Sequence, residues 1–116
     1  MNYKVKYSPE AGDKLRELKK QISNLYGESV ATRVISKIMS DIRGLRDYPE
    51  KGPSVEALLG IPTPYRFIHI EKNYVFYRLE YDTVLVTDIY NERENFMWRM
   101  FKVDLRTEEC MDFWKE

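Results

Sequence analysis

The sequence predicts an α+β fold, in which a pair of helices packs on a mostly antiparallel β-sheet. Three observations predict it: an alternating segment at the start, two long amphipathic segments after it, and three segments of strand periodicity joined by tight turns. A chain of 116 residues has room for one hydrophobic core. Its composition, 43% apolar and 33% charged, is typical of a globular domain with a well-solvated surface.

The first two expected elements are a strand and a helix. In residues 2–7, tyrosine and valine alternate with polar side chains, which is the period of a half-buried strand. Ser8 suits the cap of a helix, and Pro9 suits its first position because proline lacks the N–H that would go unpaired there. Apolar residues recur at helical spacing over residues 11–25, and Gly27 is a C-terminal stop signal.

A second amphipathic helix is expected over residues 28–45. The short turn between the helices predicts an antiparallel hairpin, and each helix is apolar on one side only, so the hairpin should cover one face of a sheet. Residues 46–64 contain four of the five prolines and are expected to form a long irregular connection. Its middle should be anchored to the body by Val55, Leu58 and Leu59.

Three antiparallel strands are expected next, over residues 65–71, 74–81 and 83–90. Lys72-Asn73 and the segment around Asp82 are short enough to be hairpin turns, so consecutive strands should be neighbours. With the helix pair on one face of this sheet, its other face is left open.

The chain is expected to end in a short helix, over residues 93–102, and an acidic tail, residues 103–116. We treat residues 1–102 as the folded domain and the tail as a separate segment. The tail has two basic and five acidic side chains, a net charge of −3, whereas the domain has a net charge of +3. The tail has a weak apolar set, Leu105, Met111, Phe113 and Trp114.

Several general features favour a cytoplasmic protein. No apolar run is long enough for a transmembrane helix, and the start lacks the apolar region of a signal peptide. The single cysteine, Cys110, cannot form an internal disulfide. One histidine and one cysteine do not make a usual metal ligand set, so neither a metal nor another cofactor is expected.

The open face of the sheet is the candidate site, because arginines and tyrosines recur along its strands. A guanidinium group suits bidentate recognition of phosphate, and a tyrosine ring stacks on a base. The candidates are Arg66 and Arg78 within strands, Tyr65 and Tyr90 at strand ends, and Arg93 after the last strand. Each of them has a structural alternative, as an exposed strand or rim residue.

His69 is the only histidine of the chain. The two-residue period of a strand places it with Phe67, on the face opposite Arg66. A general acid or base must come within hydrogen-bond reach of its substrate, so His69 and Arg66 are not expected to act together.

Several short motifs follow one another along the chain in an order and spacing that can be compared with known families. They are Ser8-Pro9-Glu10-Ala11, the stretch from Leu45 to Gly52, Tyr65-Arg66, Asn73-Tyr74-Val75-Phe76-Tyr77, and Ile89-Tyr90 followed by Arg93. In this order and spacing the chain resembles the RelE/ParE family of toxins from type II toxin–antitoxin pairs, often described as plasmid-stabilisation toxins, over about residues 2–102. The resemblance implies a small cytoplasmic toxin that a cognate antitoxin holds inactive.

The resemblance leaves two modes of action open. RelE-like members cleave messenger RNA in the ribosomal A site without a metal, whereas ParE-like members share the fold but poison DNA gyrase. For the first mode, the resemblance implies that Arg66 and Arg93 are catalytic and stabilise charge on the scissile phosphate. The residues then expected to contact the substrate are Tyr65, Arg78, Tyr90 and the loop residue Lys51, with Glu50 and Lys51 as alternative acid–base groups.

Three functions are therefore expected as alternatives. The first is a metal-independent endoribonuclease that acts on messenger RNA on the ribosome. The second is a gyrase inhibitor without catalysis, which the zero net charge of the chain favours. Glu92 also favours it, because it stands where family members often have a second basic residue before Arg93. The third is a degenerate member that only binds its antitoxin.

Overall fold

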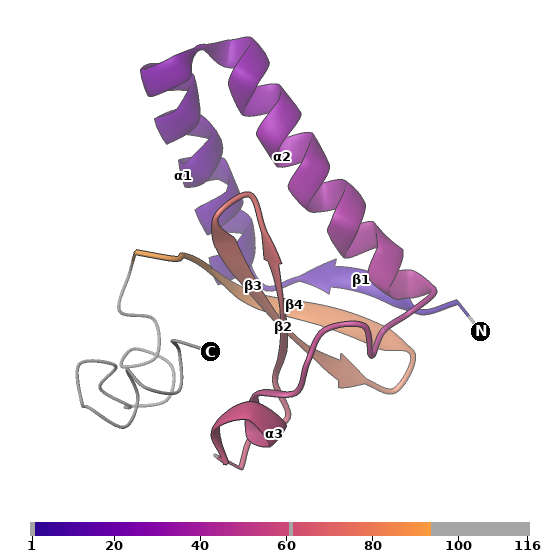
Figure 1. Ribbon diagram of the computed structural model, residues 1–116. Helices are drawn as coiled ribbons and strands as arrows, with labels where there is room; N and C mark the ends of the chain where they lie inside the picture. Colours follow the sequence, from indigo (N-terminus) through magenta and orange to yellow (C-terminus); the bar gives the residue numbers. More distant parts are fainter. Residues whose placement is uncertain (1, 61, 94–116) are drawn as a thin grey trace, which may run out of the picture.

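The computed structural model describes residues 2–60 and 62–93, and it confirms the expected α+β fold (Figure 1). A helical hairpin covers one face of a four-stranded sheet, and a short third helix lies at the opposite end of the molecule from the hairpin tip (Figure 1). The expected C-terminal helix and the acidic tail lie outside the described residues. The elements are β1 (Lys4–Tyr7), α1 (Pro9–Tyr26), α2 (Glu28–Arg43), the 3₁₀ turn η1 (Gly44–Arg46), α3 (Val55–Leu59), β2 (Arg66–Ile70), β3 (Asn73–Glu80) and β4 (Thr83–Asn91).

The strands of the sheet lie in the order β1–β4–β3–β2. Strands β2, β3 and β4 form the expected antiparallel meander. Strand β1 pairs in parallel with β4, with Val5 opposite Val84. The first strand of the chain therefore pairs with the last strand of the described fold, and β1 and β2 are the two edges of the sheet.

Ser8 joins the N-terminus of α1 to the sheet. Its side-chain oxygen accepts a hydrogen bond from the N–H of Ala11 at 3.1 Å, which caps the helix as expected. Its hydroxyl also donates to the carbonyl oxygen of Thr87 in β4 at 2.8 Å. The helix ends at Tyr26, and it is followed by Gly27, whose φ of 96° lies in the region that favours glycine.

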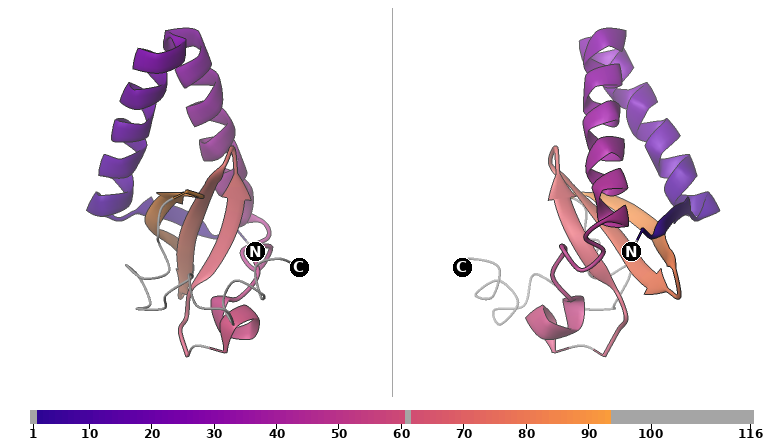
Figure 2. Two further views of the ribbon diagram at one scale, coloured as in Figure 1. Left: turned by 60° about the vertical axis from the view of Figure 1, so that its left-hand side comes forward. Right: turned by 90° about the vertical axis from the view of Figure 1, so that its right-hand side faces the viewer.

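The hydrophobic core lies between the hairpin and the sheet. Helix α2 contributes more to it than α1, because α1 buries only Ala11 and Leu15 whereas α2 buries four residues. The tip of the hairpin extends beyond the sheet (Figure 2), and Leu25 and Tyr26 at the end of α1 are 74% and 69% exposed. The fully buried side chains on the sheet include Val75, Tyr77, Val84 and Val86.

The connection over residues 46–64 is more ordered than the sequence predicted. It contains α3, whose N-terminus is capped by Ser54, with the Ala57 N–H donating to the Ser54 hydroxyl oxygen at 3.3 Å. Gly60 ends this helix in the left-handed conformation. Val55 is 2% exposed, so the expected anchoring of this segment is confirmed for that residue.

Two expected boundaries are wrong by one or two residues. The second helix ends at Arg43 rather than at residue 45, because the chain tightens there into the 3₁₀ turn η1. The first hairpin turn is Glu71-Lys72, with φ values of 50° and 65°, rather than Lys72-Asn73. Asn73 is instead the first residue of β3, and it is buried with its side-chain amide donating to the Glu71 carbonyl oxygen at 2.8 Å.

Strand β4 contains a bulge at Thr87 that the alternation of its residues does not predict. Val86 and Asp88 pair with consecutive residues of β3, so Thr87 has no partner in the register. The additional residue reverses the alternation of the strand beyond it. As a result, Ile89 lies in the core on the same side as Val86, and Tyr90 lies on the other side.

Candidate functional site

Arg66, the expected catalytic arginine, holds the loop that follows η1. Its Nη1 donates to the carbonyl oxygens of Gly52 at 2.8 Å and of Glu50 at 3.4 Å. Arg66 shares its face of β2 with Ile68 and Ile70, which pack in the core beneath the helices. The expectation that Arg66 lies on the open face is therefore wrong, because that face of β2 is the one that the hairpin covers.

Tyr77 of β3 contacts the same loop from inside the core. Its buried hydroxyl donates to the Pro49 carbonyl oxygen at 2.8 Å and accepts from the Gly52 N–H at 3.0 Å. Burial raises the pKa of Tyr77 above its ordinary value of 10.0, although the Gly52 N–H and the Arg66 guanidinium act in the opposite direction. We name Arg66, Tyr77 and the backbone of residues 49–52 the loop clamp.

The loop clamp requires glycine at position 52. A Cβ atom added to Gly52 would overlap the carbonyl oxygen of Phe67 and would lie 2.7 Å from the hydroxyl oxygen of Tyr77. The backbone of the loop therefore rests directly on β2 and β3, at a distance that no side chain permits.

Lys51 lies on the outer side of this loop. It is exposed and lines an open pocket of about 720 Å³ together with Tyr3, Tyr48 and Glu50. Lys51 and Glu50 belong to the loop whose backbone Arg66 contacts. However, the guanidinium of Arg66 is bonded to the backbone oxygen of Glu50. The loop clamp therefore joins the Arg66 side chain to the backbone of the loop, and not to the side chain of Glu50 or Lys51.

The opposite face of the sheet carries a cluster of aromatic side chains, which we name the aromatic face. Phe67 contacts Tyr74 edge to face, with ring centroids 5.7 Å apart, and Phe76 contacts Tyr90 in the same manner at 6.1 Å. The ring of His69 lies 4.8 Å from that of Tyr74. The expectation that His69 and Arg66 lie on opposite faces is therefore confirmed.

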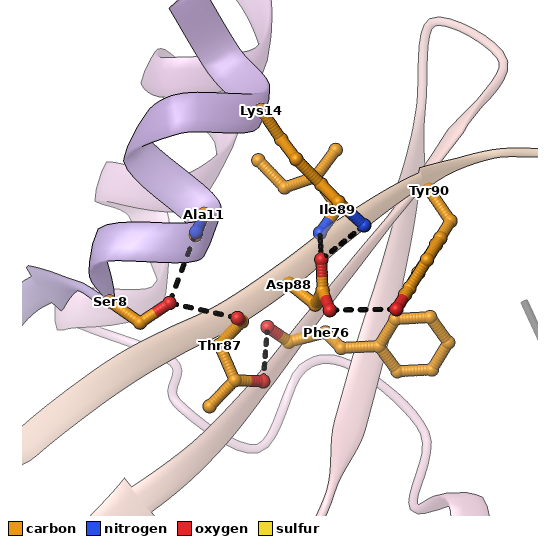
Figure 3. Close-up of polar contacts among 8 residues, drawn as sticks. All are labelled: Ser8, Ala11, Lys14, Phe76, Thr87, Asp88, Ile89 and Tyr90. Atoms are coloured by element: carbon orange, nitrogen blue, oxygen red, sulfur yellow. Dashed lines mark hydrogen bonds and ion pairs between the residues drawn. The ribbon is translucent and has the colours of Figure 1, made fainter. Parts of the chain in front are cut away.

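Asp88 is the centre of a polar cluster beside the aromatic face (Figure 3). Its carboxylate accepts hydrogen bonds from the Tyr90 hydroxyl at 2.7 Å and from the Ile89 N–H at 2.9 Å. Lys14 reaches from α1 to form an ion pair with Asp88 at 2.6 Å, and its Nζ lies 3.4 Å from the centroid of the Tyr90 ring. Both the ring and the hydroxyl of Tyr90 are thus engaged within the protein.

Glu92 makes a side-chain hydrogen bond at the same end of the sheet. Its Oε2 lies 2.9 Å from Nε2 of His69, and its N–H donates to the Lys72 carbonyl oxygen at 3.0 Å. A carboxylate therefore takes the position where the family resemblance implies a second basic residue. It binds the one histidine of the chain.

The remaining expected site residues lie in separate surroundings. Arg78 points away from the helices and pairs with Glu80 at 2.6 Å. Its Nε is buried without a hydrogen-bond partner among the described residues. Tyr65 is half-buried, and its carbonyl oxygen accepts from the Val55 N–H at 3.0 Å. Arg93 is exposed just beyond β4.

The two expected catalytic arginines lie at different ends of the sheet. Arg66 is opposite Tyr77, which is opposite Val86, whereas Arg93 follows Val86 by seven positions in the chain. At about 3.3 Å per strand residue, this offset places the two arginine backbones roughly 20 Å apart. Their guanidinium groups therefore do not converge on a single phosphate in this structure.

Three charged residues of these clusters were not among the expected site residues: Lys14, Asp88 and Glu92. The sequence identifies Glu92 only as an acidic residue at a position that is often basic in the family. The spacing of Asp88 and Tyr90 was a visible signal, because residues two apart in a strand share a face. Lys14 gave no signal of its own, since it is one of several lysines on the polar side of a helix.

The described part of the chain contains no group of three or more histidine, cysteine, aspartate or glutamate side chains placed to hold a metal ion. None of the helices within residues 2–60 and 62–93 is both long and apolar enough to cross a membrane.

The family model of the ParE toxin of the type II toxin–antitoxin system parDE matches residues 5–96. The match spans β1, the helical hairpin, the loop clamp and the whole antiparallel meander. The chain belongs to the ParE toxin family. The expected membership of the RelE/ParE family is therefore confirmed, and the match lies on its ParE side.

Comparison with solved structures agrees with the ParE family at the level of the fold. The chain is similar to a structure titled "Chromosomal ParDE TA system from P. aeruginosa", with a TM-score of 0.65 and 15% sequence identity. The similarity covers 77% of this chain and 95% of that chain. A comparison with curated proteins gave no match.

Proposed function

We propose that this ParE-family chain is the toxin of a type II toxin–antitoxin pair and that it acts in the cytoplasm by binding DNA gyrase, without cleaving RNA. Membership of the ParE family supports the toxin role. The observation that carries the choice of mechanism is the loop clamp, in which the expected catalytic Arg66 is bonded to two backbone carbonyl oxygens.

Cleavage of RNA by a 2′-hydroxyl needs several groups within reach of one phosphate. A general base, a general acid and a cation must converge within hydrogen-bond distance of the reacting atoms. In this fold Arg66 and Arg93 lie at different ends of the sheet, and His69 lies on the face opposite Arg66. This separation supports a toxin that acts by binding.

The proposal is tested with purified gyrase and the purified full chain. Relaxed plasmid DNA is the substrate for supercoiling, and supercoiled plasmid DNA is the substrate for the control. We expect supercoiling to be inhibited and linear DNA to accumulate after the gyrase is denatured, because a poison traps the cleaved intermediate. Relaxation by a type I topoisomerase in the same buffer is the control, and it should be unaffected. Full supercoiling activity in excess chain would refute the proposal.

The alternative, ribosome-dependent cleavage of messenger RNA, is decided by a parallel experiment. The chain is added to a cell-free translation reaction and the messenger ends are mapped by primer extension. Our proposal predicts intact messenger. Cuts within codons would instead support the endonuclease, with Arg66, Arg93, Tyr65, Arg78, Tyr90 and Lys51 as the expected site residues.

A comparison of Arg66→Ala with Tyr77→Phe tests whether Arg66 acts as a catalytic group or by holding the loop. Both substitutions disrupt the loop clamp, but only the first removes a guanidinium group. If Arg66 acts through the clamp, the two variants should lower toxicity in cells to a similar extent. A loss of toxicity with Arg66→Ala alone, at equal folded fraction by circular dichroism, would make the guanidinium itself the functional group.

We propose in addition that a cognate antitoxin neutralises this chain. Co-expression with the product of a small adjacent reading frame should restore growth, and the two proteins should purify as one complex. Growth arrest that such co-expression does not relieve would contradict this pairing.

A further inference from the structure

Two adjoining pockets form a continuous groove along the outer edge of β1. They measure about 320 and 440 Å³ and share Tyr7 and Met39 in their lining. One side of the groove is α1 and the other is α2 with η1. The floor includes the apolar side chains of Val5, Leu15 and Ile35. Since β1 is an edge strand of the sheet, the groove combines an apolar floor with a strand edge.

The rim of this groove is basic. All the charged side chains that line the two pockets are cations: Lys4, Arg16, Lys19, Arg43 and Arg46. Lys4 and Arg16 each have an acidic neighbour, Asp82 and Asp13 respectively. The other three have no ion pair within the described part of the chain. We name this surface the basic groove.

The tail of the same chain has the complementary chemistry. Residues 103–116 carry five acidic and two basic side chains, and Met111, Phe113 and Trp114 follow one another closely within them. An acidic segment with a compact apolar set matches a basic rim with an apolar floor, since opposite charges steer the contact and buried apolar area holds it.

The connection between the fold and the tail is long enough for this contact. Ser8, at the groove, is bonded to Thr87, and Arg93 follows Thr87 by six positions, or roughly 20 Å of strand. Residues 94–102 span up to about 30 Å when extended. The tail can therefore pass around α1, whose diameter is about 10 Å, and enter the groove.

We propose that residues 103–116 dock in cis on the basic groove and cover the edge of β1. Within one chain the effective concentration of the tail is high, on the order of millimolar for a short linker, so weak individual contacts suffice. The docked tail would compete with any other protein segment that binds this groove. The proposal concerns the groove alone and stands or falls independently of the gyrase target.

The natural cysteine of the tail permits a direct test on the full chain. A nitroxide spin label is attached to Cys110 of the ¹⁵N-enriched protein, and amide signals are compared before and after reduction of the label. We expect signals of Ile35, Met39 and Arg43 to lose most of their intensity, while those of His69 and Phe67 on the aromatic face keep theirs. Raising the salt to about 1 M should restore the groove signals, because it shortens the screening length to about 3 Å.

Charge reversal with a matched control tests the electrostatic part. Arg43→Glu should weaken the broadening at Met39 by roughly twofold to fivefold, as for removal of one exposed ion pair. Arg33→Glu, the same change at an exposed position of α2 outside the groove, should leave it unaltered. Combining Arg43→Glu with Glu109→Lys should restore the broadening.

Three results would overturn the proposal. Signals that keep their intensity everywhere would show that the tail is free, and broadening confined to the aromatic face would show that it lies there. Broadening in a mixture of spin-labelled unenriched chain and unlabelled ¹⁵N chain would show that the tail binds a second copy instead.

Discussion

The loop clamp and the basic groove both contain arginine, but the side chains have different surroundings. In the clamp, Arg66 donates to two backbone carbonyl oxygens beside the buried Tyr77. In the groove, Arg43 and Arg46 are exposed and have no ion pair among the described residues. An arginine that lies beside loop carbonyl oxygens stabilises the loop. An exposed arginine at the end of a helix keeps its guanidinium group accessible to a binding partner.

Of the substitutions that compare the two regions, Gly52→Ala in the loop clamp should lower the free energy of unfolding most. The new methyl group would collide with backbone of β2 and with Tyr77, so the loop must move and the clamp must open. We expect a loss of roughly 3 kcal/mol in the free energy of unfolding, measured by urea denaturation. Gly44→Ala is the control, because its added Cβ would meet no side chain or distant backbone within 4 Å and its φ of −60° suits alanine. Equal losses in both variants would mean that the close packing at position 52 is not what stabilises the loop.

Tyr77→Phe should have the next largest effect. The substitution leaves the Gly52 N–H and the Pro49 carbonyl oxygen without their hydrogen-bond partner, which costs about 2 kcal/mol when such groups are buried. The same denaturation measurement detects it. A variant as stable as the wild type would show that water replaces the hydroxyl at no cost.

Tyr77 also gives the stability a dependence on alkaline pH. Because its pKa is raised in the folded state, the folded state holds the proton more tightly than the unfolded state. This contribution is complete below about pH 10 and is lost as the pH rises through the folded-state value. The free energy of unfolding should therefore fall less steeply above pH 10 in Tyr77→Phe than in the wild type. Some slope should remain, since burial also raises the pKa of Tyr7 and of Tyr74.

The smallest expected effect is that of Arg43→Glu on stability. Arg43 is exposed at the end of α2, and no ion pair is lost with it among the described residues. We expect a change within about 0.5 kcal/mol in the free energy of unfolding, although a negative charge at a helix C-terminus is slightly unfavourable. A thermal melt beside that of Gly52→Ala compares the two regions directly. A loss comparable to that of Gly52→Ala would assign Arg43 a structural role like that of Arg66.

Local signals in the sequence predicted most of the fold. Ser8, Pro9 and Gly27 act within a few residues of themselves, so their caps and stops could be placed without knowledge of the rest of the chain. Likewise, the two-residue period placed Arg66 and His69 on opposite faces of β2. Helix α3 was missed because its signal is one serine and one glycine in a segment rich in proline.

The contacts of the candidate site could not be predicted in the same way. Arg66 meets Gly52 across 14 positions and Tyr77 meets Pro49 across 28, so no local pattern contains both partners. The bulge at Thr87 is a second example. One unpaired residue there decides whether Tyr90 faces the core or the aromatic face, and hydrophobic alternation alone does not show where such a residue is inserted.

The parallel pairing of β1 with β4 has a consequence for the time at which the protein becomes functional. Ser8 and Thr87 are separated by 79 positions, and at about 5–20 residues per second a ribosome needs roughly 4–16 s to synthesise the intervening chain. Until then β1 has no partner strand, and closing so long a loop is intrinsically slow. A chain that stops before Thr83 lacks the strand that joins β1 to the meander. Premature termination before β4 therefore yields fragments without the complete sheet, and the toxin fold forms only after the ribosome has passed that strand.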